Sequence, residues 1–461
     1  MICAPRVLSG AAWGVAMACA LPMLAVALAA VTSGTETIVH LASTVLGRYS
    51  INTVFLILLV SVGTFAIGVG AAWLVTMTHF KGVKFFEIAL VLPLAFPAYV
   101  LAYAYTSVLD HPGIVQSTLR NVMDWGPRDY WFPEIRSLGG AALMLVLVLY
   151  PYVYLLARAS FIQQSGSAFM TARGLGASPL AAFLTVSLPL ARPAIAAGVL
   201  LAVMETIADF GTVAYFGVQT FATGIYTSWF SMGDRAGAAQ LAVCLLMFAF
   251  MLAVLERIQR GRAKYYDQSR SQKHHAALPL KGLRAVFAMV LCAIPVLLGV
   301  IIPIFSLIVL GLDSDQDLLS SRYLGFARNS LVLASTAALI TVFAAIGLGF
   351  FQRMQPGRSS TMATYIARLG YAVPGGVIAV GLMVPFAAFD NAIDAWMRTT
   401  FNISTGLMLT GSIWLLVLAY MVRFLAAALG AYEGGQSLVH VHMDAASRSL
   451  GKGPFATLRK V

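Results

Sequence analysis

Ten apolar stretches, each long enough to cross a membrane as a helix, run through this 461-residue chain. A helix of about 20 apolar residues spans the hydrocarbon core, where every backbone polar group must be paired within its own segment. Only 10% of the residues are charged, against roughly a quarter in ordinary globular proteins. The chain is therefore predicted to be an all-α, polytopic membrane protein. We place the spans at about 11–31, 52–77, 86–109, 139–161, 194–216, 238–256, 284–311, 329–352, 365–389 and 407–431.

The net charge of +12 could indicate a nucleic-acid partner, but the positions of the basic residues argue against one. If the N-terminus is cytoplasmic and the loops alternate, 21 Lys and Arg lie in inner segments and 8 in outer ones. Such a bias is what the positive-inside rule expects. The basicity therefore predicts a multi-pass protein with a cytoplasmic N-terminus, in contact with membrane lipid and not with nucleic acid.

The N-terminus could also be a signal sequence, because Arg6 precedes an apolar run and Ala18-Cys19 is similar to a lipoprotein cleavage site. Membrane-type sequence continues through Val31, which favours an uncleaved first span. The four cysteines show no paired spacing and are expected to be small buried hydrophobes.

An internal repeat divides the chain. Landmarks recur in the same order about 277 positions apart: Asn52 and Asn329, Leu92 through Pro97 and Tyr371 through Pro374, and Tyr150 and Tyr420. We predict a first repeat of six spans at 1–256, a basic cytoplasmic linker at 257–284, and a second repeat at 285–461. Six is an even number, so the two repeats are expected to be parallel.

The most informative repeated segment lies in a predicted cytoplasmic loop at 168–192. Its first copy runs from Arg173 through Leu175, Gly176 and Pro179 to Phe183. Gly176 permits a tight turn that ends one short helix, and Ser178-Pro179 is a typical start of the next. We predict a helical elbow with Leu175, Leu180 and Phe183 as an apolar contact surface and Arg173 as a charged one.

The second copy contains Arg448, Leu450, Gly451 and Pro454, and the sequence ends at Val461 before its Leu-Pro. If the second repeat matches the first, about twelve spans are expected in a complete chain. From the sequence we therefore expect a second repeat truncated within its loop, and a chain that does not transport unless the missing segment is supplied.

At these residues the chain resembles the permease subunits of binding-protein-dependent ABC importers, whose cytoplasmic loop has the form E-A-A-x-x-x-G followed by I-x-L-P. In the first copy the E-A-A positions are held by Met170, Thr171 and Ala172, the Gly by Gly176, and I-x-L-P by Val186 through Pro189. In the second copy Ala445, Ala446 and Ser447 hold E-A-A and Gly451 holds the Gly, so neither copy keeps the Glu.

The resemblance implies two bundles of the ABC importer permease (MetI-like) type and a loop that docks on a dimer of P-loop ATPase subunits in the cytoplasm. It also implies a periplasmic substrate-binding protein on the outer side, which we expect near 110–138 and 217–237. The stretch from Glu205 to Leu241 most resembles the fused ferric-iron importers. The chain has no G-x-x-x-x-G-K-[ST] motif, so it is expected to be non-catalytic and to bind no cofactor, with ATP held by the partner subunit.

Glu205 and Asp209 are the candidate substrate-path residues. They are four positions apart in the fifth predicted span, which places both carboxylates on one helix face. Acids within a membrane usually face a cavity or a partner, and carboxylates suit a hard cation such as ferric iron. The alternative is a structural role, with the acids satisfied by backbone groups or by Arg423. No metal site is expected, and His274-His275 and His440 through His442 are interpreted as solvated polar residues.

Alternatives to an iron importer remain. The same importer class could carry thiamine, a polyamine or a phosphonate. A secondary transporter would need intramembrane ion sites in both halves, usually with inverted repeats, and would not need twin cytoplasmic elbows. A membrane enzyme would need a catalytic constellation that the sequence does not contain.

Overall fold

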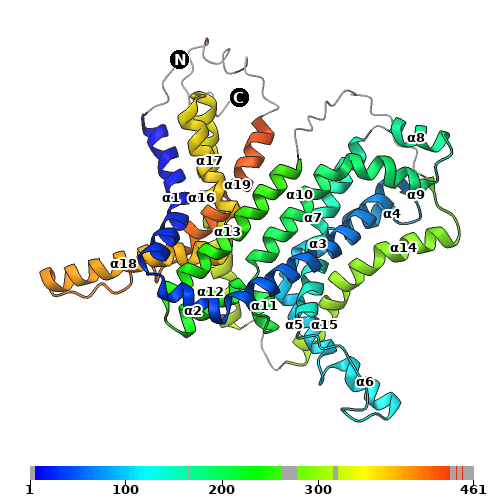
Figure 1. The fold of residues 1–461 in the computed structure, drawn as a ribbon, viewed down its shortest axis with the longest axis horizontal. Coiled ribbons are helices and arrows are strands. Elements are labelled where there is room, and N and C mark those ends of the chain that lie inside the picture. Colours follow the sequence, from blue (N-terminus) through cyan, green and yellow to red (C-terminus); the bar gives the residue numbers. More distant parts are fainter. Residues whose placement is uncertain are drawn as a thin grey trace. The chain divides into compact units, whose positions relative to one another are not determined.

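The computed structural model describes residues 6–164, 166–260, 278–314 and 320–436, together with Met443 and Ser449. Figure 1 shows a chain built almost entirely of helices. In the part before the basic linker these are α1 (Arg6–Thr32), α2 (Glu36–Thr44), α3 (Leu46–Met77), α4 (Val83–Ala89), the 3₁₀ helix η1 (Leu92–Ala95), α5 (Ala98–Leu109), α6 (Ile114–Met123), α7 (Leu138–Gln163), α8 (Gly166–Gly174), α9 (Pro179–Ala182), the π-helix η2 (Phe183–Ser187), α10 (Leu188–Ala208), α11 (Gly211–Tyr215), α12 (Phe221–Tyr226), the π-helix η3 (Thr227–Ser231) and α13 (Arg235–Arg260).

The part after the linker contains fewer elements. They are α14 (Leu283–Val296), the π-helix η4 (Leu297–Ile301), α15 (Ile302–Leu312), α16 (Ser321–Met354), α17 (Arg358–Ala372), α18 (Gly375–Phe401) and α19 (Ile413–Gln436). Two short strands, β1 (Thr78–His79) and β2 (Leu278–Pro279), pair in parallel. Within the described residues, nine helices are long and apolar enough to cross a membrane, and one bent helix pair makes a tenth. The prediction of an all-α protein with ten spans is therefore confirmed.

Three predicted spans are not continuous helices: the one at about 194–216 is broken at Asp209, where α10 ends, and two others are broken before a proline. The windows at about 86–109 and 365–389 both run across a break, so the sequence prediction was wrong there. At the first break Phe96 is extended (φ −91°, ψ 131°) and Pro97 (φ −62°, ψ 133°) starts α5. At the second, Val373 (φ −88°, ψ 122°) precedes Pro374 (φ −58°, ψ 145°), which starts α18. The cause is the same in both, because a residue before proline disfavours the helical region.

The elements of the two halves correspond in order. Met77 ends α3 and Met354 ends α16, 277 positions later, and the breaks at Pro97 and Pro374 have the same spacing. α1 corresponds in the same way to α14 with α15, and α7 to α19. The repeat inferred from the sequence is thus also a repeat of helices and of their interruptions.

The chain forms two compact units, and neither is one half of the sequence. One unit combines α1 with α16 to α19 and the start of α13, and the other combines α3 to α11 with α14 and α15. The first helix of each half therefore packs into the bundle of the other half. Figure 1 shows α1 (blue) beside the yellow α16 and α17, and α14 (yellow-green) beside the blue α3.

In the unit that contains α3, hydrogen bonds join the exchanged helices to the bundle. The Tyr105 hydroxyl donates to the Leu298 carbonyl (2.8 Å), which lies in the π-helix η4. The hydroxyls of Ser107 and Ser306 lie 2.9 Å apart. Because hydrocarbon offers no competing partner, such bonds stabilise helix association in membranes.

In the unit that contains α16, close packing holds the exchanged helix α1. A side chain at Gly381 of α18 would overlap the backbone of Pro22 in α1, so the absence of a Cβ lets the two helices meet. In the N-terminal part of α1, the Trp13 indole N–H donates to the Ser359 hydroxyl (3.1 Å). Small residues at a helix interface permit this kind of close approach in membranes.

The exchange leads to a prediction about separated halves. Fragments produced by a cut within 261–277 should each be poorly stable alone, because the first lacks α14 and α15 of the unit that it mainly builds and the second lacks α1 and the start of α13. Expressed together in one membrane they should co-purify through a tag on either fragment. Two fragments that are each monodisperse alone, and that do not co-purify, would contradict the exchange.

Candidate functional site

The predicted elbow is present in the first half. α8 ends at Gly174, and the chain turns through Gly176, whose φ of +91° is a left-handed conformation. The Ala177 N–H donates to the Ala172 carbonyl (3.1 Å) and the Gly176 N–H to the Arg173 carbonyl (3.1 Å). These two bonds form a Schellman motif, in which glycine supplies the left-handed residue at no steric cost.

The second arm of the elbow begins as expected. Ser178 is the N-cap of α9, and its hydroxyl accepts from the Ala181 N–H (3.1 Å), while Pro179 occupies the first turn. α9 continues without a break into η2 and α10. The amide of Gln164, at the end of α7, donates to the Ser187 carbonyl (3.0 Å) and so ties the two ends of the elbow together.

Of the expected apolar contact surface, two residues are exposed and one is not. Leu175 is 85% exposed and Leu180 58%, so both are available to a partner. Phe183 is only 8% exposed, because its ring packs against Trp73 (5.0 Å between centroids) and Phe161 (5.9 Å). The prediction that Phe183 belongs to the contact surface was therefore wrong: its side chain anchors the elbow to α3 and α7.

Arg173 also has a role within the elbow. Its guanidinium donates to the Ala177 carbonyl across the turn (2.8 Å), and its side chain is half-buried. A charge-assisted bond of this kind stabilises the end of α8. From the sequence we predicted only a partner-contact role for Arg173, because residue spacing does not indicate the hydrogen bond from its guanidinium to the Ala177 carbonyl.

The second copy cannot be compared in the same way. Arg448, Leu450, Gly451 and Pro454 lie outside the described residues, as do His274-His275 and His440 through His442. Their predicted roles stay predictions.

The candidate path residues do not share a helix face. α10 ends at Ala208, and Asp209 follows it with an extended backbone (φ −70°, ψ 124°). The Asp209 carboxylate accepts from the N–H groups of Thr212 (3.1 Å) and Val213 (3.2 Å) and from the Thr212 hydroxyl (3.0 Å). Asp209 thus caps the first turn of α11. This is the structural role that was the alternative to a place in the substrate path. Glu205 remains within α10 and is partly buried.

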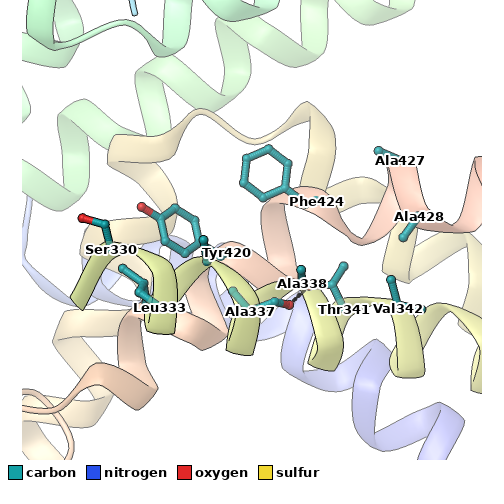
Figure 2. Close-up of a pocket in the computed structure, with 11 residues that line it drawn as sticks. Ser330, Leu333, Ala337, Ala338, Thr341, Val342, Tyr420, Phe424, Ala427 and Ala428 are labelled. Atoms are coloured by element: carbon teal, nitrogen blue, oxygen red, sulfur yellow. Dashed lines mark hydrogen bonds between the residues drawn. The ribbon is translucent and has the colours of Figure 1, made fainter. Parts of the chain in front are cut away.

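A groove of about 660 Å³ lies between α16 and α19 (Figure 2). Tyr420 and Phe424 of α19 stand over Leu333, Ala337 and Thr341 of α16. At the offset of 277, the α16 residues Leu333, Ala337 and Thr341 correspond to Leu56, Val60 and Thr64 of α3, which are all buried. Leu56 and Val60 share a buried cluster with Ala202 of α10. The first half thus packs α10 on this helix face, whereas in the described second half the same positions line the groove, with Ala337 and Thr341 still buried and Leu333 half-buried.

Residues 64–264 match the family described as "Binding-protein-dependent transport system inner membrane component". These residues include α7, the elbow, α10 and the whole of α13.

Several curated proteins are similar to this chain. The Fe(3+)-transport system permease protein FbpB 2 of Haemophilus influenzae is 25% identical over 417 residues, which cover 88% of this chain and 74% of that protein. The putative ferric transport system permease protein FbpB 1 of the same organism is 22% identical, over 89% of this chain and 65% of that protein. The molybdenum transport system permease protein ModB of Escherichia coli K12 is 28% identical over 206 residues, 42% of this chain and 87% of that protein. Residues 64–264 thus match a domain of this transport family, and the chain along most of its length is similar to inner-membrane permeases of binding-protein-dependent importers.

Proposed function

We propose that this chain is the transmembrane subunit of an ATP-driven importer that carries ferric iron from a periplasmic binding protein across the inner membrane. A separate dimer of P-loop ATPase subunits binds and hydrolyses ATP, and this chain is not itself catalytic. The N-terminus and the elbow lie in the cytoplasm. This topology is supported by the excess of Lys and Arg on that side.

The observation that carries the coupling role is the rigid elbow with two exposed leucines. Leu175 and Leu180 project from a turn that is closed by two backbone bonds, while Phe183 anchors it to the bundle. A partner that pushes on the leucines would therefore move α10 with them, since α9, η2 and α10 are continuous. This arrangement favours a device that transmits motion from an ATPase, and a secondary transporter would not need one.

Iron is favoured over other cargoes because relatives aligned along most of the chain are named as ferric transporters. The molybdenum and 2-aminoethylphosphonate permeases align over less than half of it.

The test is uptake by the assembled transporter in proteoliposomes with its ATPase and binding protein. Ferric iron, molybdate, thiamine, putrescine and 2-aminoethylphosphonate should be compared. Iron uptake that requires ATP supports the proposal. Uptake that is driven by an ion gradient without ATP would contradict the proposal.

Substitutions of Glu205 and Asp209 should have different effects on uptake and on stability. Glu205→Gln should lower iron uptake, because it removes a membrane carboxylate in α10. Asp209→Asn should leave uptake nearly normal, because Asn caps a helix about as well as Asp, whereas Asp209→Ala should cost about 1 kcal/mol of stability. Initial uptake rates and thermal unfolding in detergent measure the two effects. If uptake survives the loss of both carboxylates, Glu205 does not line the path.

A further inference from the structure

A second groove lies between α3 and α14, at the end of these helices where the two short strands pair. Its volume is about 470 Å³, within the range of small-ligand pockets. Gly70, Trp73 and Leu74 of α3 line one side, and Phe287, Ala288 and Leu291 of α14 line the other. The groove belongs entirely to the unit that contains α3. Its lining is apolar along the helices, and Arg284 lies at one end.

The strand pairing brings two basic segments to that end. Thr78 pairs with Leu278 and His79 with Pro279, and the Leu280 N–H donates to the His79 carbonyl (2.9 Å). Lys81 and Lys84 follow β1, and Lys281 and Arg284 follow β2. All four side chains belong to exposed residues. Arg284 lines the groove itself, and Lys81, Lys84 and Lys281 lie within a few residues of the paired strands, where Thr78 and Leu280 also line it.

The two described segments that carry these cations hold no acid of their own. Residues 78–86 and 278–296 contain neither Asp nor Glu. The first acid to follow β1, Glu87, is engaged by Arg158 (3.0 Å). In addition, the N-cap residue of α14, Gly282, provides no side-chain cap, so the positive end of the helix dipole near Leu283 and Arg284 also favours an anion.

We propose that this groove is a binding site for one anionic phospholipid. The acyl chain would lie along α3 and α14, and the headgroup phosphate would meet Lys281 and Arg284, with Lys81 and Lys84 beside it. Basic pockets between membrane helices on the cytoplasmic side recognise anionic headgroups in this way. Trp73 also packs against Phe183, so a lipid in the groove would touch the residue that supports the anchor of the elbow.

The test is binding of phosphatidylglycerol to the full chain after purification in detergent and removal of native lipid. Native mass spectrometry with phosphatidylglycerol and phosphatidylcholine at equal concentration measures affinity and selectivity. Wild type should bind one phosphatidylglycerol with clear preference. Lys281→Gln/Arg284→Gln should weaken that binding about 30-fold, taking about tenfold for each 1.4 kcal/mol and about 1 kcal/mol for each surface cation.

Matched controls separate the site from bulk charge. Arg192→Gln/Arg358→Gln removes the same charge from two exposed residues that do not line the groove, and should leave phosphatidylglycerol binding unchanged. Gly70→Leu should reduce binding of both lipids while it keeps every cation, because a side chain at Gly70 meets no atom within 4 Å and projects into the groove.

Three outcomes would overturn the proposal. The first is equal binding of the two lipids by wild type. The second is unchanged phosphatidylglycerol binding in Lys281→Gln/Arg284→Gln, checked by circular dichroism to be folded. The third is displacement of bound phosphatidylglycerol by millimolar glycerol phosphate, which would identify a site for a soluble phosphate. None of these outcomes depends on which cargo the importer carries.

Discussion

Gly176→Val should abolish transport while the protein still inserts into the membrane. Gly176 has a φ of +91°, where a β-branched side chain is strained although no neighbouring atom lies within 4 Å. The strain of roughly 1–2 kcal/mol shifts the equilibrium away from the native turn by roughly 5- to 30-fold. ATP-dependent uptake and recovery of the ATPase by co-purification should both fall, with an unchanged amount of protein in the membrane fraction.

The matched control is the same substitution two residues earlier. Gly174 ends α8, its φ lies outside the left-handed region, and a side chain there also meets no atom within 4 Å. Gly174→Val should therefore transport much like wild type. If both variants lose transport, added bulk and not backbone conformation is the cause. If Gly176→Val transports normally, the elbow does not couple the ATPase to the bundle.

Phe183→Ala should lower both the stability of the protein and its association with the ATPase. Removal of a buried phenylalanine costs about 3–5 kcal/mol, from lost burial and from the cavity left behind. Here the cavity would open between Trp73 and Phe161, so the second arm of the elbow would lose its anchor on α3 and α7. Thermal unfolding in detergent and the apparent affinity for the ATPase measure the two effects.

The exposed neighbours of Phe183 provide the comparison. Leu180→Ala should weaken ATPase association with little change in thermal stability, because Leu180 is 58% exposed. Leu184→Ala, at 50% exposed, should likewise leave stability nearly unchanged. A stable Phe183→Ala protein would show that the ring packing does not hold the elbow in place.

The spans and the elbow could be predicted because short-range chemistry determines both. Apolar length alone specifies a membrane helix, and the glycine turn and the Ser-Pro helix start depend on residues within a few positions of one another. The breaks in the two spans interrupted before a proline were not predicted, although both prolines are present in the sequence. Hydropathy averages over a window and does not register that Phe96 and Val373 must be extended before Pro97 and Pro374.

The side-chain roles within the site were harder to predict. Whether Phe183 faces a partner or the bundle depends on Trp73, which is 110 positions earlier in the chain. Asp209 was expected on a helix face because the apolar pattern continues past it, but its carboxylate instead binds the first amides of α11. The helix exchange was also not predicted, since an apolar span carries no mark of the bundle that it joins.

The exchanged first helices also determine the order in which the protein can mature. Trp13 of α1 bonds to Ser359, 346 positions later, so α1 enters the membrane long before its final neighbours are synthesised. The bundle around α3 likewise waits for α14 and α15. Contacts between such distant residues form slowly and leave intermediates exposed to quality control. Neither unit can therefore fold completely before synthesis of the other begins. Both units complete their assembly late, after most of the chain has been made.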